Sequence, residues 1–193
     1  MKKVISLLLC GVMLLSLCAC LKAPKLEGSF TDMNDDRRYT FTLGEKSSGD
    51  YGGSCEYYEN GKLARTDAWY VEKNKVFING VYTFNIDGEY LAEVSSKCTD
   101  VTVSGAVVTG TVPSTTVSGL SFRTAILYNP DIMFKDDGTC EATGQMLLMA
   151  KKTVHGTYSV EGKLIKITFD EEKFDHTAYV LDGDMYYDVF IKS

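Results

Sequence analysis

The ten residues WYVEKNKVFI at positions 69–78 return without a gap as YSVEGKLIKI at positions 158–167. In this register the apolar residues coincide at every second position. The coinciding pairs are Trp69 with Tyr158, Val71 with Val160, Val76 with Ile165, and Ile78 with Ile167. Side chains of a strand alternate between its two faces, so residues two positions apart share one face. The positions between them change character, as Phe77 against Lys166 shows. We therefore expect two copies of one β-ribbon whose inward face is retained.

A second echo lies downstream, where YTFNIDGEYL at 82–91 resembles TAYVLDGDMY at 177–186. After a loop of different length, this echo pairs Phe84 with Tyr179, Ile86 with Leu181, and Asp87-Gly88 with Asp182-Gly183. Asn-Gly and Asp-Gly pairs supply the positive φ angles that tight hairpins need. We expect each copy to be an antiparallel meander.

The turn residues divide the chain into strands. In the first copy we expect strands at residues 28–31, 38–43, 54–59, 66–72, 75–79, 81–86 and 89–94. In the second copy we expect them at residues 120–128, 131–135, 139–148, 154–160, 163–169, 176–181 and 184–191. The segment 145–152, QMLLMAKK, could make two helical turns and is assigned as strand. We predict an all-β protein of two tandem antiparallel meander units, small barrels or sheets, packed together. The alternative is one larger closed β-barrel with strands from both copies.

The first twenty residues carry targeting information. Lys2 and Lys3 precede an apolar run of about 14 residues, which is short for a bilayer span and typical of a signal peptide. The run ends in Leu17-Cys18-Ala19-Cys20, which resembles the bacterial lipobox. That resemblance implies that Cys20 is lipidated and becomes the new N-terminus. The alternative is an ordinary secretory signal peptide cut near Ala19.

The domain organisation follows from these segments. We expect a lipoprotein signal peptide at 1–19, lipidated Cys20 and a tether at 20–25, a first β repeat at 26–98, a connector at 99–118 and a second β repeat at 119–193. The connector is rich in Val, Thr, Ser and Gly. It could be flexible, or its β-branched residues could form a hairpin around Ser104-Gly105. Left uncovered, such a hairpin would present an edge prone to pairing.

Short motifs in both copies resemble the small lipocalin-like repeat of bacterial lipoproteins. The first copy opens with the Leu-x-Gly-x-aromatic motif, Leu26-Glu27-Gly28-Ser29-Phe30. The second copy carries Phe134-Lys135-Asp136-Asp137-Gly138, His155-Gly156-Thr157-Tyr158 and Leu181-Asp182-Gly183-Asp184. Its opening departs from the pattern, since Gly119 precedes Leu120. The resemblance implies a fold and an envelope location, and it carries no ligand or catalytic residues.

Charge and cysteine content exclude several classes of protein. Without Lys2 and Lys3 the 20 basic residues become 18, against 26 acidic ones, a formal charge of −8 that argues against nucleic acid. Three cysteines lie beyond the targeting segment: Cys55, Cys98 and Cys140. One disulfide with a free thiol, or three thiols, are both open. The chain has no CxxC pair to mark a zinc or redox site.

Two acidic loops are candidate metal sites. The segment 32–36, DMNDD, has oxygen ligands at alternate positions, but Arg37 stands where a calcium loop requires Gly and Leu43 where it requires Glu. The second copy has a longer loop that contains Asp170, Glu171, Glu172, Asp175 and His176. Nothing in their spacing fixes a coordination geometry. We expect both segments to be solvated acidic loops and predict no metal and no cofactor.

Aromatic residues and histidines complete the list of candidates. Trp69 is the only tryptophan, and its register partner Tyr158 places it in the core. Tyr57-Tyr58 and Tyr186-Tyr187 each put one ring on either face, and outward tyrosines suit carbohydrate or protein contacts. The only histidines are His155 and His176, and neither GxSxG nor HExxH occurs, so no catalytic constellation can be assembled. We expect His155 at the surface or at a strand start.

These observations predict a non-catalytic surface lipoprotein that serves as a binding or structural module of the cell envelope. Its expected partners are the membrane, through the lipid on Cys20, and a protein, a glycan or a small apolar ligand. Nucleic acid is not expected, and the oligomeric state is open. The alternative function is a lipocalin-like carrier with an apolar ligand in the barrel interior. An enzyme with its chemistry on the second acidic loop is a third hypothesis.

Overall fold

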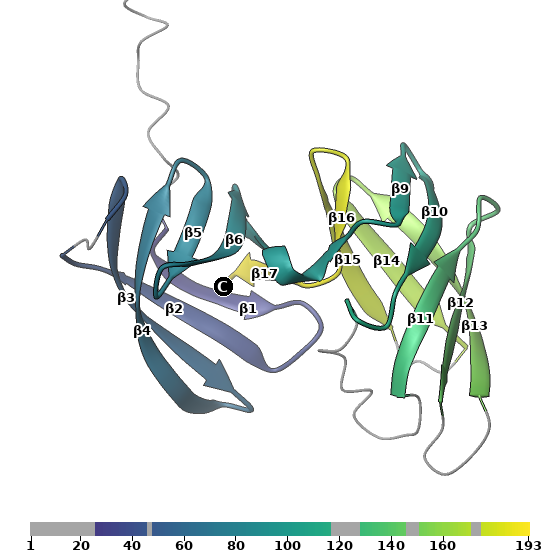
Figure 1. Ribbon diagram of the computed structural model, residues 1–193, viewed down its shortest axis with the longest axis horizontal. Helices are drawn as coiled ribbons and strands as arrows, with labels where there is room; N and C mark the ends of the chain where they lie inside the picture. Colours follow the sequence, from purple (N-terminus) through teal and green to yellow (C-terminus); the bar gives the residue numbers. More distant parts are fainter. Residues whose placement is uncertain (1–25, 46–47, 117–127, 146–150, 171–174) are drawn as a thin grey trace, which may run out of the picture.

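The computed structural model describes residues 26–45, 48–116, 128–145, 151–170 and 175–193. They form two antiparallel β-barrels that lie next to each other (Figure 1). The fold is all-β with two units in tandem, as the sequence predicts, and the single larger barrel is not formed. Among the described residues, no helix is long and apolar enough to cross a membrane.

The first barrel is closed by eight strands in the order β1-β17-β7-β6-β5-β4-β3-β2. Their bounds are β1 Gly28–Asp32, β2 Arg37–Leu43, β3 Tyr51–Glu59, β4 Lys62–Glu72, β5 Lys75–Ile78, β6 Val81–Asp87, β7 Tyr90–Glu93 and β17 Val189–Lys192. The hairpin turns carry the residues that tolerate positive φ, such as Asn60 and Asn79.

The second barrel is nearly closed, with nine strands in the order β8-β16-β15-β14-β13-β12-β11-β10-β9. Their bounds are β8 Lys97–Cys98, β9 Val101–Ser104, β10 Val107–Val112, β11 Tyr128–Phe134, β12 Thr139–Gln145, β13 Lys151–Glu161, β14 Leu164–Phe169, β15 His176–Leu181 and β16 Asp184–Tyr186. A short 3-10 helix, η1 at Val94–Ser96, leads into β8. The connector therefore takes the hairpin form, as β9 and β10, and belongs to the second barrel.

The first barrel takes its last strand from the end of the chain, after the second barrel. After β7 the chain leaves the first barrel, and β8 pairs with β16 of the second. After β16 the chain returns, and β17 pairs with both β1 and β7 of the first barrel. The expected single strand at 184–191 is thus two strands that belong to different barrels. The second barrel is a continuous insertion between β7 and β17.

The two crossing segments are hydrogen-bonded to each other in a nearly symmetric way. The Glu93 amide donates to the Asp188 carbonyl at 3.1 Å, and the Tyr187 amide donates to the Ser96 carbonyl at 2.9 Å. The Asp188 amide also donates to the Ser96 hydroxyl oxygen at 2.9 Å. Each crossing segment therefore pairs backbone groups of the other at the junction.

The strand pairing confirms the first echo in the sequence. Trp69 lies opposite Ile78, and Tyr158 lies opposite Ile167. Both rings are inside their barrels, with exposures of 0% and 8%, and each packs edge-to-face on a phenylalanine, Phe41 in one barrel and Phe134 in the other. The indole nitrogen donates to Ser54 O at 2.9 Å, and the Tyr158 hydroxyl donates to backbone carbonyls of Val108 and Lys135. The two residues hold equivalent places.

The second echo is off by one residue. Phe84 lies opposite Val76, whereas the residue opposite Ile165 is Ala178, so Phe84 corresponds to Ala178 and not to Tyr179. A shift of one residue moves a side chain to the other face of its strand. The expected interior residues Tyr179 and Leu181 therefore point out of the barrel and into the junction.

The second copy opens at β10. Gly110 lies opposite Phe134 as Gly28 lies opposite Phe41, and both glycines have positive φ, 116° and 103°. A Cβ at Gly110 would come within 2.1 Å of the Asp100 carbonyl oxygen, so a side chain is excluded there. The opening motif is thus matched by VTGTV at 108–112. The expected strand at 120–128 and the expected continuation over 146–148 lie almost wholly outside the described residues.

Side chains fill both interiors. The core of the first barrel consists of Leu26, Phe30, Tyr39, Phe41, Cys55, Trp69, Val71, Val76, Ile78, Phe84, Ile86, Leu91 and Phe190. The core of the second contains smaller residues, among them Val108, Val112, Ile132, Ala142, Val154, Ile165, Ile167 and Ala178. The interior of a barrel of about eight strands is just wide enough for such side chains to fill it.

We predict that Phe190→Ala lowers the free energy of unfolding of the first barrel by about 3–5 kcal/mol, the usual cost of truncating a buried phenylalanine. Phe190 packs on Tyr39 and Phe84 with ring centroids 5.4 and 5.3 Å away, although it comes from the far end of the chain. Trp69, the only tryptophan, reports this barrel by its fluorescence during urea unfolding.

The matched control is Ile165→Ala in the second barrel. It should destabilise the protein as judged by circular dichroism but shift the Trp69 transition less than Phe190→Ala does. An unchanged Trp69 midpoint in Phe190→Ala would contradict the assignment of β17 to the first barrel.

Candidate functional site

The junction between the barrels is a packed interface with its own apolar cluster. Ala92, Tyr179, Leu181, Tyr186 and Val189 are buried there. Tyr90 of the first barrel stacks on Tyr179 of the second with ring centroids 4.9 Å apart. The Tyr179 hydroxyl donates to Asp87 at 2.8 Å, and Asp87 also pairs with Lys163. The interface joins the two barrels through both apolar and polar contacts.

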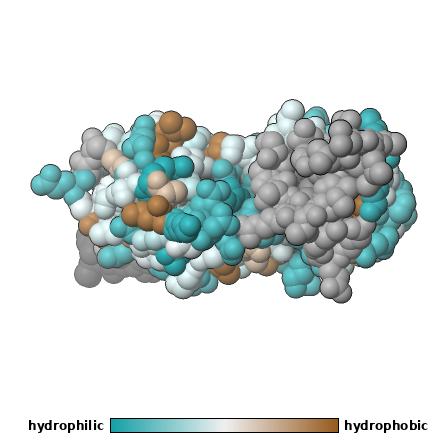
Figure 2. All heavy atoms as spheres, turned by 90° about the horizontal axis from the view of Figure 1, so that it is seen from below, coloured by the Kyte–Doolittle hydropathy of each residue, from teal (hydrophilic) through white to brown (hydrophobic). Residues whose placement is uncertain are grey.

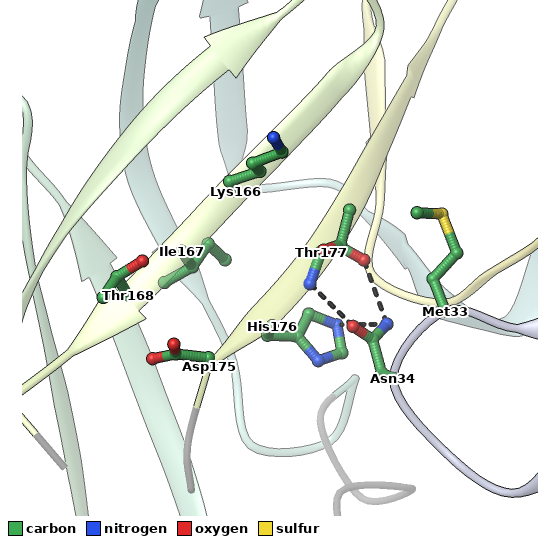
Figure 3. Close-up of a pocket in the computed structure, with 8 residues that line it drawn as sticks. All are labelled: Met33, Asn34, Lys166, Ile167, Thr168, Asp175, His176 and Thr177. Atoms are coloured by element: carbon green, nitrogen blue, oxygen red, sulfur yellow. Dashed lines mark hydrogen bonds between the residues drawn. The ribbon is translucent and has the colours of Figure 1, made fainter. Parts of the chain in front are cut away.

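The acidic segment 32–36 docks on the second barrel and does not form a calcium loop. The Thr177 amide donates to Asn34 Oδ1 at 2.7 Å, and Asn34 Nδ2 donates to the Thr177 carbonyl at 3.0 Å (Figure 3). The side-chain amide thereby occupies the place of a neighbouring strand beside β15. Asp32 holds the turn by accepting the Asn34 amide at 2.8 Å. The sequence could not indicate this role because the partner lies in the other repeat.

A polar groove of about 280 Å³ runs between this segment and strands β14 and β15. Its lining residues are Met33, Asn34, Lys166, Ile167, Thr168, Asp175, His176 and Thr177 (Figure 3). Met33 and Asn34 come from the first barrel and the others from the second. The groove contains both a lysine and an aspartate, and it lies outside the barrels.

His176 is buried beneath this groove and is held in one orientation. It stacks on Tyr187 with ring centroids 3.7 Å apart, and its Nε2 lies 2.7 Å from the Tyr187 carbonyl oxygen, to which it donates. Burial lowers the pKa of His176 to about 3, so the ring is neutral at physiological pH. Its Nε2 proton is donated to a backbone carbonyl, which together with the stacked Tyr187 ring holds the imidazole in place.

The second acidic loop does not assemble as a metal site within the part of the chain that the structure describes. Asp175 accepts the Phe169 amide at 3.0 Å, and His176 turns inward. Glu171 and Glu172 lie outside the described residues. No group of three His, Cys, Asp or Glu residues in the described ranges is placed to hold a metal ion.

Arg37 forms a partly buried charge cluster at the point where the chain crosses between the barrels. Its Nε donates to Asp32 at 2.7 Å, and its terminal nitrogens lie 3.3 Å from Glu93 and 3.2 Å from Asp188. These three carboxylates come from the end of β1, the end of β7 and the returning crossing segment. One guanidinium therefore links three segments of backbone.

The cluster holds more negative than positive groups, and burial acts on them. Burial raises the pKa of Asp188 to about 7, with Arg37 opposing and Glu93, Asp32 and Asp35 adding to the rise. Burial likewise raises the pKa of Asp32 against the effect of Arg37. A carboxyl with its pKa raised in the folded state favours folding in its protonated form.

The other candidate residues are dispersed. Tyr57 packs against the core of the first barrel while Tyr58 lies under Arg38, 4.2 Å from the guanidinium carbon, so this pair does divide between the two faces. Tyr187 belongs to the core of the second barrel and Tyr186 to the junction cluster, so this pair also divides between two faces, but both rings are buried and neither is available at the surface. His155 is on the exposed face of β13, 3.4 Å from Glu141.

The three cysteines of the described chain are free and buried. Cys55 lies opposite Phe41, and Cys140 lies opposite Phe134, so these two occupy equivalent core positions. Burial raises the pKa of all three thiols to about 12. They behave as small apolar residues and not as nucleophiles.

The outer face of the first barrel carries a row of aromatic rings. Tyr70 and Phe77 stack with centroids 4.7 Å apart, and Tyr82 continues the row at 5.5 Å. On the face shown in Figure 2, hydrophobic residues of the first barrel are separated by hydrophilic ones and do not form one continuous patch.

Comparison of the chain with protein-family models, with curated proteins and with solved structures finds no match.

We predict that Asp188→Asn becomes more stabilising as pH rises. Asp188 ionises in the folded protein near pH 7 but near its ordinary value when unfolded, so the wild type loses stability between about pH 4 and 7. The asparagine variant avoids this loss. Urea unfolding should show similar stabilities near pH 4 and an advantage of about 1–3 kcal/mol for the variant at pH 8.

His176 has the opposite effect on stability: its neutral, buried form destabilises the fold as the pH falls below the pKa of the histidine in the unfolded chain. This effect is the same in the variant and the wild type, so it cancels in the difference between their stabilities. Asp184→Asn serves as the control, because Asp184 is an exposed partner of Lys97. A difference for Asp188→Asn that does not change with pH would show that the cluster does not titrate in this range.

Proposed function

We propose that this protein is a lipid-anchored, non-catalytic module of the bacterial cell envelope that binds a partner through its outer surface. The observation that carries this proposal is the filled interior of both barrels. Buried aromatic and aliphatic side chains make up the cores of both barrels, and the first has the larger share of aromatic rings. A protein with this architecture has its contacts with other molecules on its outside.

The envelope location is supported by the N-terminal sequence. The signal-like segment and the motif ending in Cys20 favour lipidation, and the resemblance to lipocalin-like lipoprotein repeats is consistent with it. Five residues, 21–25, separate Cys20 from Leu26. Fully extended they reach about 15–20 Å. The first barrel would therefore be held close to the membrane, and the second would be attached to it through the junction.

A non-catalytic role is supported by the state of the polar groups at the junction. His176, Asp175 and Asn34 all have backbone partners, and Arg37 is occupied by three carboxylates. Groups that are fully engaged in holding two barrels together fix their relative orientation. This favours a module that presents its surface rigidly.

The carrier of a small apolar ligand is the second candidate, and the filled cores argue against it. We predict that fatty acids and apolar dyes at micromolar concentration leave the Trp69 emission unchanged, because Trp69 is fully buried and packs against Phe41 and Tyr51. A saturable change in Trp69 fluorescence, absent from a Trp69→Phe control, would revive the carrier hypothesis.

The anchor has its own test. We predict that Cys20→Ala abolishes labelling by a radioactive fatty acid and moves the protein from the membrane pellet to the soluble fraction, since one residue carries the acyl chains that hold the protein to the bilayer. Cys18→Ala is the matched control and should remain labelled and sedimenting. Membrane association of unlabelled Cys20→Ala would overturn the lipoprotein assignment.

A further inference from the structure

The strand that closes each barrel occupies the same place in the two rings. In the first barrel β17 lies between β1 and β7 and pairs with both. In the second barrel the corresponding place, between β10 and β16, is filled by β9, which pairs with β10, and by β8, which pairs with β16. Only Thr99 and Asp100 separate β8 from β9, and β9 also lies close to β16. The segment β8–β9, residues 97–104, is therefore the closing strand of the second barrel.

The strand register makes Phe190 and Cys98 equivalent residues. Strands β6 and β15 correspond, and the hairpins that follow them have equal length, so Leu91 of β7 corresponds to Met185 of β16. Phe190 lies opposite Leu91, and Cys98 lies opposite Met185. Phe190 is buried in the core of the first barrel and Cys98 in the core of the second. The two closing strands thus place one side chain at the same point of the two interiors.

The crossing segments are related in the same way. Glu93 and Tyr187 hold equivalent positions at the ends of β7 and β16, and Ser96 and Asp188 hold equivalent positions before the two closing strands. The Glu93 amide donates to the Asp188 carbonyl, and the Tyr187 amide donates to the Ser96 carbonyl. These reciprocal bonds relate the segments as an approximate two-fold axis would. Such symmetry at a crossing point is expected of two units that exchange an equivalent element.

The order of the chain shows that each closing strand completes the barrel to which the preceding strand does not belong. Segment β8–β9 follows β7 of the first barrel but closes the second, and β17 follows β16 of the second barrel but closes the first. Residues 94–96 separate β7 from β8, and residues 187–188 separate β16 from β17. Hairpin loops of two or three residues are common, so each strand is able to fold back on the one before it. Short hinge loops under strain favour exchange instead.

We propose that this structure is an intramolecular strand exchange, in which β8–β9 and β17 are equivalent closing strands that have changed places. In the alternative closure β8–β9 completes the first barrel and β17 completes the second. The barrels would then be joined by Gly105-Ala106, between β9 and β10, and the crossing bonds would be absent. The exchange therefore ties the two barrels together through two crossing segments where the alternative closure has one short connection.

The sizes of the two equivalent residues decide which barrel each strand closes. Phe190 packs on Tyr39 and Phe84 inside the first barrel. Cys98 lies in the second core, which also contains the buried Tyr187. A cysteine in the place of Phe190 would leave a cavity, and a phenylalanine in the place of Cys98 would overpack the second core. The observed closure is favoured because each barrel receives the residue that fits it.

Disulfide reporters distinguish the two closures in the full chain. Ile191 lies opposite Thr31, so Thr31→Cys with Ile191→Cys should form a disulfide in the observed closure after mild oxidation. Ile191 also lies opposite Tyr90, whose equivalent in β16 is Asp184. Asp184→Cys with Ile191→Cys should therefore form a disulfide only in the alternative closure. Peptide mass mapping without reduction identifies each bond, and the wild-type core should give only the first.

Exchanging the two core volumes should move the equilibrium toward the alternative closure. Phe190→Val with Cys98→Phe transfers the large side chain from β17 to β8–β9. It should raise the yield of the disulfide between positions 184 and 191 about fivefold or more and lower that between positions 31 and 191. Phe190→Val with Cys140→Phe is the control, because it moves the same volume to a core position outside the closing strands. Circular dichroism confirms that each variant is folded.

Lengthening the hinge tests the exchange without changing the core. Inserting Gly-Asn-Gly between Tyr187 and Asp188 gives β17 a relaxed loop on which to fold back, and it should also raise the yield of the disulfide between positions 184 and 191. The same insertion between Asn60 and Gly61, in the exposed turn between β3 and β4, is the control and should leave both disulfides unchanged.

Two outcomes would overturn the proposal. One is that the folded core and hinge variants keep the disulfide between positions 31 and 191 and form none between positions 184 and 191. The other is that the latter disulfide appears only in a dimer of twice the mass, since the strands would then exchange between chains and not within one.

Discussion

The closure of the first barrel by the C-terminal strand is the contact on which the rest of the structure depends. Phe190, near the end of the chain, completes a core whose other members all come from its first half. β17 supplies the partner that β1 and β7 both need. Without it the first barrel would have two open edges and a missing core residue. Because the second barrel lies between β7 and β17, the same contact also holds that barrel in place.

This arrangement gives the two barrels different constraints. The second barrel is contiguous in sequence, so its strand pairings can form as soon as residues 97–186 are present. The first barrel cannot close before the last residues of the chain exist. A chain that folds in this order exposes the edges of β1 and β7 until its last residues have been synthesised. The short strand β17 then pairs with both edges and protects them.

The crossing point shows how polar groups define a junction that apolar packing alone would leave adjustable. Tyr90 and Tyr179 supply buried area, but stacked rings can slide. The paired bonds between Asn34 and Thr177 have fixed directions, and the three carboxylates around Arg37 have fixed distances. The excess negative charge in this cluster has a free-energy cost, which appears as the raised pKa of Asp188. Orientation is gained at the expense of some stability.

The sequence by itself determined most of the strands and the duplicated core, because these depend on local patterns. The alternation around Trp69 and Tyr158 fixed which face is buried, and the strand ladders bear this out. The sequence could not place Tyr179, because the loop before this residue differs in length between the two copies. An error of one residue in the alignment moves a side chain to the opposite face of its strand. Only the tertiary structure decided that the second barrel is inserted before the last strand of the first, and that Asn34 and His176 belong to the junction. These outcomes depend on which strands lie side by side in space. The local sequence of one copy does not indicate which residues of the other copy it contacts.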